Sequence, residues 1–132
     1  MSLIAELKED HRKIKALIEE IKSRSIASEE GRSLLGELKT LLVAHLARED
    51  RELYPALKAL EQSNAIASAF QTEMGSITAQ ALQIFERYEH GIKDKSQFAR
   101  DTGQLFALVS GRIIKEEMRL YPAYTENVEF RI

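Results

Sequence analysis

Apolar residues recur at alternating intervals of three and four positions along most of this chain, and no other feature of the sequence limits the fold as strongly. This spacing places the apolar side chains on one face of an α-helix, a face that must be buried against other elements. In the first such stretch the inward line includes a histidine. Its members are Ile4, Leu7, His11, Ile14, Ile18 and Ile21.

The same period predicts four long helices. Ser28 is a suitable N-cap for the second helix because acidic residues follow it, and Pro55 should kink or restart that helix. The first helix is predicted to span residues 3–24 and the second to start at residue 29. The third helix should follow a turn at residues 63–64 and end near Gly91, and the fourth should span residues 96–121. The predicted inward lines are Leu38, Leu42, His45, Glu49 and Leu53, then Ile66, Phe70, Met74, Ile77, Ala81, Ile84 and Tyr88, then Phe98, Leu105, Val109, Arg112, Glu116 and Leu120.

The two halves of the chain resemble each other, because "REDRELYP" at residues 48–55 is echoed by "KEEMRLYP" at residues 115–122. When the two repeats are aligned, Glu49 corresponds to Glu116 and His45 corresponds to Arg112. Short polar turns between long amphipathic helices favour an up-down-up-down arrangement. We therefore expect an all-α, antiparallel four-helix bundle built from two similar helical hairpins, with residues 1–132 forming one domain.

Composition excludes several kinds of site. The chain has no cysteine, so it cannot form a disulfide, an iron–sulfur cluster or a thiolate zinc site. Its net charge of −2 comes from interleaved acidic and basic residues, which argues against nucleic acid as a partner. No apolar run reaches the roughly 20 residues of a membrane span, and "MSLIAELKED" does not resemble a signal peptide. We expect a cytoplasmic protein without a membrane partner.

Polar residues on the inward lines point to a cation. An ionised carboxylate buried without a partner costs several kcal/mol, so Glu49 and Glu116 need a positive charge between them. A metal ion bound by His11, His45, Glu49 and Glu116 would supply it, because His45 and Glu49 lie one helical turn apart. Two imidazoles and two carboxylates suit iron, manganese or zinc.

This pattern resembles the hemerythrin-like, HHE cation-binding domains. The resemblance rests on His11, the His45-x-x-x-Glu49 unit, the repeated "LYP" helices and the duplicated hairpin, and it covers essentially the whole chain. It implies a non-haem di-iron centre inside the bundle, bridged by carboxylates of the second and fourth helices and capped by histidines of all four. Members of this family bind oxygen, sense oxygen or redox state, or handle iron.

The sequence departs from the family pattern in its second half. The resemblance implies histidines at positions 74 and 112 for the other iron, but Met74 and Arg112 stand there. We therefore do not expect a full di-iron centre. Either one ion, with iron preferred over zinc or manganese, shares the carboxylates with Arg112, or Arg112 alone neutralises them in a metal-free core.

These two outcomes imply different functions. The first is a non-enzymatic module that senses or responds to metal, oxygen or redox state; the second is a metal-free interaction or regulatory protein. The sequence contains neither a grouping of residues for nucleophilic catalysis nor a phosphate-binding glycine loop. We therefore do not expect an enzyme.

Some residues also allow other placements. Arg112 could extend its side chain to water, and Glu116 could face solvent if the fourth helix were rotated. The tyrosines of the "LYP" elements are expected to pack the end of the bundle. The apolar C-terminal residues, among them Val128 and Phe130, either pack back on the bundle or contact a protein partner or a second copy of the chain.

Overall fold

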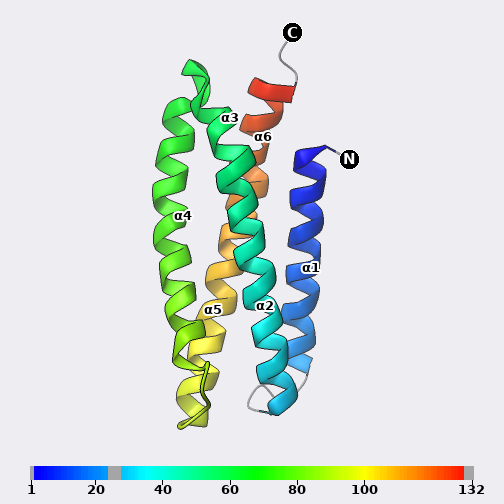
Figure 1. Ribbon diagram of the computed structural model, residues 1–132, viewed down its shortest axis with the longest axis vertical. Coiled ribbons are helices and arrows are strands. Elements are labelled where there is room, and N and C mark those ends of the chain that lie inside the picture. The colour runs from blue at the N-terminus through cyan, green and yellow to red at the C-terminus, as the bar shows by residue number, and fades with distance from the viewer. Residues whose placement is uncertain (1, 24–27, 130–132) are drawn as a thin grey trace.

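Four long helical stretches lie side by side along the length of the protein (Figure 1). The computed structural model describes residues 2–23 and 28–129. The first and third stretches are single helices, whereas the second and fourth each continue through a π-helical turn into a shorter helix. The elements are α1 Leu3–Ser23, α2 Glu29–Arg48, η1 Glu49–Leu53, α3 Tyr54–Lys58, α4 Glu61–Arg87, α5 Lys95–Lys115, η2 Glu116–Leu120, α6 Tyr121–Tyr124 and η3 Thr125–Glu129.

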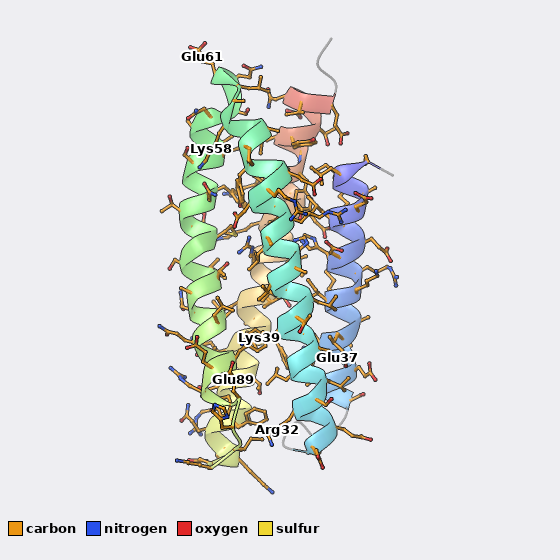
Figure 2. All side chains as sticks on the ribbon, viewed as in Figure 1. Arg32, Glu37, Lys39, Lys58, Glu61 and Glu89 are labelled. Carbon is orange, nitrogen blue, oxygen red and sulfur yellow. The ribbon has the colours of Figure 1, made fainter. Side chains whose placement is uncertain are left out.

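Successive stretches run in opposite directions, so the expected up-down-up-down antiparallel bundle is confirmed (Figure 1). α1 packs on α2, α4 packs on α5, and contacts between α1 and α5 complete the arrangement. At the lower end of Figure 2, Lys39 lies beside Glu89, and their ion pair, with Nζ 2.8 Å from Oε1, links α2 to the segment after α4. Among the residues that the structure describes, no helix combines the length and apolar character needed to cross a bilayer.

Most helix boundaries agree with those predicted. Ser28 is the N-cap of α2, where its side chain accepts a hydrogen bond from the Gly31 backbone N–H at 3.0 Å. Asp94 caps α5 in the same way, by accepting bonds from two backbone N–H groups. Gly91 has a φ of 134°, a conformation open to glycine, in the turn after α4. Residue 24, the predicted end of the first helix, lies outside the described residues.

The predicted turn at residues 63–64 is wrong, because α4 already begins at Glu61. Ser63 and Asn64 lie in its first turn and bond back to carbonyl groups at the end of α3. The Ser63 hydroxyl donates to the Leu57 carbonyl at 2.7 Å, and the Asn64 amide donates to the Lys58 carbonyl at 2.9 Å. These polar residues therefore cap the preceding helix instead of forming a loop.

The inward line of α4 is also shifted at its start. Ile66, predicted to be buried, is 40% exposed, and Ala67 takes the inward place. The small alanine allows the helix to approach its neighbours closely. At the other end of the chain, Val128 packs against the core, whereas Phe130 lies outside the described residues, as does Ile132.

The apolar core consists of two clusters along the length of the bundle. One includes Ile14 and Val109, and the other includes Leu7 and Leu120. On the first, second and fourth stretches, polar residues of the predicted inward lines lie between the two clusters; His11, for example, lies between Leu7 and Ile14. The protein thus has a polar layer enclosed by apolar side chains on both sides.

Candidate metal centre

Both inward carboxylates begin a π-helical turn. Glu49 opens η1 and Glu116 opens η2, and in each case the backbone N–H of the tyrosine five residues later donates to the carbonyl of that glutamate. A proline follows each tyrosine and lacks the N–H that a regular helix needs. The wider turn adds one residue to the helical circuit, so both members of the Leu53–Tyr54 pair are buried.

The four residues predicted as metal ligands lie together in the polar layer. One ligand atom from each of His11, His45, Glu49 and Glu116 lies within 4.8 Å of all the others. None of the four is more than 2% exposed. His11 comes from α1, His45 and Glu49 from α2 and η1, and Glu116 from η2. The alternative in which the fourth helix turns Glu116 toward solvent is therefore excluded.

The two imidazoles face each other through their Nε2 atoms, which are 3.1 Å apart. The His11 Nε2 lies 3.1 Å from Glu116 Oε1, and the His45 Nε2 lies 3.4 Å from Glu49 Oε2 and 3.6 Å from Glu116 Oε1. Ligands held about 2.1 Å from one ion lie about 3.0 Å apart at right angles and about 3.4 Å apart in a tetrahedron. The separations match those of ligands around a single ion, so this half of the site fits a metal.

Two further carboxylates orient the imidazoles. The outer nitrogen, Nδ1, of His11 lies 2.7 Å from Glu117 Oε2, and Nδ1 of His45 lies 3.0 Å from Asp10 Oδ2. A carboxylate accepts, so each Nδ1 donates, and in the neutral imidazole each Nε2 directs its lone pair into the site. Sequence reasoning missed Asp10 and Glu117, because each lies beside an inward residue and reaches the imidazole of another helix from the flank.

Arg112 occupies the other side of the two carboxylates and is only 6% exposed. Its NH2 group donates to Glu49 Oε1 at 3.0 Å, and its Nε lies 3.5 Å from Glu116 Oε2. Its NH1 group donates to the Met74 carbonyl at 3.3 Å and also to the Thr78 hydroxyl. Each glutamate thus directs one oxygen toward the histidines and the other toward the guanidinium.

This second half does not fit a metal ion. A guanidinium carries a positive charge and offers no lone pair, and Met74 contributes only a buried thioether. The third histidine of the chain, His90, lies in the turn after α4 and not in the polar layer. Arg112 pairs internally, as one of the two predicted placements required.

Charge and burial act together on these groups. Burial by itself lowers the pKa of His45, but hydrogen bonds and charge from Glu116 and Glu49 outweigh burial and raise this pKa to about 10. Burial raises the pKa of Glu49 to about 7, whereas hydrogen bonds from Glu49, His11 and His45 overcome burial and lower the pKa of Glu116. Burial also tends to lower the pKa of Arg112, but the charges of Glu116 and Glu49 raise it. The carboxylates therefore favour positive charge on every side.

Tyr121 was predicted to pack the end of the bundle, and it does belong to the apolar cluster of Leu7 and Leu120, but its hydroxyl, for which no role was predicted, enters the polar layer. The hydroxyl donates to Glu49 Oε2 at 2.8 Å and lies 3.1 Å from the His11 Nε2. Its partner in the sequence repeat, Tyr54, is buried, and its hydroxyl has no hydrogen-bond partner among the described residues. The π-helical turn brings Tyr121 onto the face of Glu116, five residues earlier, which the regular helical period does not predict.

A surface cleft of about 230 Å³ reaches the Arg112 side of the layer. It opens between α2 with η1 and α4, and its lining includes Asp50, Gln71 and Thr78. The residues nearest the imidazoles do not line it. The cleft therefore brings solvent close to the half of the layer that holds the guanidinium.

Comparison with known families returns one result. The family model described as the hemerythrin HHE cation binding domain matches residues 2–124. No curated protein matches the chain, and no solved structure does so either. The matched segment contains the whole polar layer.

Proposed function

This chain belongs to the hemerythrin HHE cation-binding domain family, and we propose that it holds a single metal ion in half of the family's site. The ligands are His11, His45, Glu49 and Glu116, and iron is the preferred ion. The ion supplies a one-electron couple when bound. The protein serves as a module that senses or responds to metal, oxygen or redox state, and it is not an enzyme.

One observation carries this proposal: two inward imidazole nitrogens lie 3.1 Å apart, and the outer nitrogen of each ring is held by a carboxylate. Both outer nitrogens donate, so when both rings are neutral two lone pairs face each other across the dry interior. Lone pairs at this distance repel unless a proton or a metal ion lies between them. The same carboxylate–histidine pairing orients the ligands of known metal sites.

The limit of one ion follows from Arg112. Its guanidinium takes the carboxylate oxygens that a second ion would need, with NH2 3.0 Å from Glu49 Oε1 and Nε 3.5 Å from Glu116 Oε2. Chemistry that requires two irons is therefore not part of this proposal. A buried ion whose ligands come from several helices is suited to changing the stability or shape of the bundle when it is gained, lost or oxidised, which supports a responsive role.

The experiment is elemental analysis of protein purified without chelator and then supplied with iron, manganese or zinc. The expected result is about one equivalent of metal per chain, lost in His45→Ala and retained in His90→Ala, whose histidine lies outside the layer. Circular dichroism checks that each variant is folded. Well under one equivalent in the parent protein, together with unchanged stability of His45→Ala, refutes the proposal.

The alternative function is a metal-free interaction or regulatory protein. The hydrogen bonds of Arg112 favour it, because the guanidinium already lies against both buried carboxylates. It predicts that the same analysis finds no bound metal under any of the three loading conditions.

A further inference from the structure

The Tyr121 hydroxyl lies among the proposed metal ligands and not at the edge of the layer. Tyr121 is the first residue of α6 and is 1% exposed. Its oxygen lies 2.8 Å from Glu49 Oε2, 3.1 Å from the His11 Nε2 and 3.4 Å from the His45 Nε2. The phenol ring stacks on the His11 ring, with centroids 5.4 Å apart and planes at 17°, and this contact fixes its direction.

When both imidazoles are neutral, as metal ligation requires, hydrogen bonding alone does not account for this position. A phenol carries one proton, which the geometry directs to Glu49, and the inward nitrogen of a neutral imidazole whose outer nitrogen donates can only accept. Five electron-rich atoms, the phenol oxygen and Glu116 Oε1 included, then surround a space with one hydrogen among them. Such a grouping is stabilised by a cation at its centre.

The distances agree with this interpretation. Two of the three separations from the Tyr121 oxygen, 3.1 and 3.4 Å to the imidazole nitrogens, fall within the range of 3.1–3.6 Å spanned by the other neighbouring pairs, and the third is the 2.8 Å hydrogen bond to Glu49. Neighbouring ligands on one ion lie about 3.0–3.4 Å apart. The phenol oxygen therefore occupies a place on the same coordination shell.

We propose that Tyr121 is a fifth ligand, which binds the ion through its oxygen as a phenolate and gives a shell of two nitrogens and three oxygens. This inference rests on the proposed function, because it requires that an ion be bound. Binding as a phenolate would require that the Tyr121 proton, which is donated to Glu49 Oε2 in this structure, be released to solvent. Three anionic oxygens favour a hard ion such as ferric iron over zinc.

The sequence repeat supplies a matched control. Tyr54 occupies the equivalent position in the first "LYP" element, and its hydroxyl is buried without a hydrogen-bond partner among the described residues. It belongs to the half of the layer that contains Arg112, where no metal fits. Tyr54→Phe removes the same atom as Tyr121→Phe but should leave the metal shell intact.

The test uses the full chain, Tyr121→Phe and Tyr54→Phe, each loaded anaerobically with ferrous iron and then oxidised with ferricyanide. A phenolate bound to ferric iron absorbs visible light through charge transfer. The parent protein and Tyr54→Phe should show this band, whereas Tyr121→Phe should lack it. Tyr121→Phe should still bind iron through the other four ligands, with affinity lower by about tenfold or more.

The outcomes separate this inference from the proposed function. If the parent binds one iron but shows no such band, or if Tyr121→Phe keeps the band, the role of Tyr121 is overturned and the four-ligand site stands. If the parent binds no iron, both are overturned. If Tyr121→Phe does not fold, resonance Raman spectra of the parent decide, because ring-deuterated tyrosine shifts the vibrations of a bound phenolate and leaves those of any other chromophore unchanged.

Discussion

At the scale of single residues, the identity of position 112 determines how the polar layer is balanced. The sequence repeat aligns Arg112 with His45, so a permanent cation stands where the first half has a histidine. Because its guanidinium contacts one oxygen of each buried glutamate, Arg112 fixes the direction of both carboxylates. The oxygens that remain face the imidazoles and form the candidate metal site.

Replacing Arg112 by leucine should destabilise the protein strongly. The variant leaves Glu49 and Glu116 without their cation in a dry interior, and removal of one partner from a buried ion pair costs about 3–5 kcal/mol. Urea denaturation of the metal-free protein measures this loss. Arg12→Leu is the control, since Arg12 is exposed and, among the described residues, pairs with Glu9 on the surface, where such pairs contribute little. Equal stability of the two variants would contradict the counter-ion role.

At the scale of elements, the helical period indicates which residues face inward but not how a π-helical turn changes the register. The four predicted ligands lie on regular inward lines, and for that reason the sequence identified them. Tyr121 follows η2, whose extra residue moves it onto the face of Glu116. Asp10 and Glu117 lie at the edges of the inward faces of their helices and contact a histidine of another helix. The periodicity of a single helix predicts only that such charged residues face solvent. Knowledge of which helices are neighbours was needed to place all three.

Turn signals were reliable where side chains cap their own helix and misleading where they cap another. Ser28 and Asp94 bond to the first turn of the helix that follows them, and these starts were predicted closely. Ser63 bonds to the carbonyl of Leu57 in the preceding helix. Its polarity indicated a loop, although it lies inside α4. Which helix a polar side chain bonds to depends on the folded structure, and the composition of a short stretch does not reveal it.

The junction between α4 and α5 depends on one buried carboxylate. Asp101 is 4% exposed, accepts from the Tyr88 hydroxyl at 2.5 Å and from the Gln97 amide at 2.8 Å, and lies 3.4 Å from Arg87. The hydrogen bond from Tyr88 is the main reason why the pKa of Asp101 lies below its usual value. A lowered pKa in the folded state stabilises the fold above the unfolded-state pKa, and this stabilisation is lost as pH falls through the folded-state value.

Tyr88→Phe should therefore lower the free energy of unfolding at neutral pH by about 1.5–3 kcal/mol, the usual contribution of a hydrogen bond to a charged group. The deficit should shrink as pH falls below about 4, because Asp101 becomes protonated in both proteins. Denaturant titrations of the parent protein and Tyr88→Phe at several pH values measure this difference in the free energy of unfolding. Tyr54→Phe, which removes a hydroxyl without a partner, should show no such deficit, and a pH-independent loss in Tyr88→Phe would exclude Asp101 as the cause.

At the scale of the whole molecule, the polar layer divides the core into two apolar clusters, and the ligands of the proposed ion come from α1, α2 with η1, and η2. An ion bound there would cross-link three of the four helical stretches between the two apolar clusters. Ions that bind the folded state only stabilise it by RT ln(1 + [L]/Kd), about 2.7 kcal/mol when free metal is at 100 times Kd. For a domain of this size that corresponds to a rise in Tm of about 10 °C.

The Tm of chelator-treated protein should therefore increase when metal is added and continue to increase with the metal concentration. His11→Ala should show a much smaller shift, because it removes the only ligand from α1. If the parent protein unfolds at the same temperature with and without metal, the layer holds no ion and its carboxylates are balanced by protein groups alone, Arg112 among them.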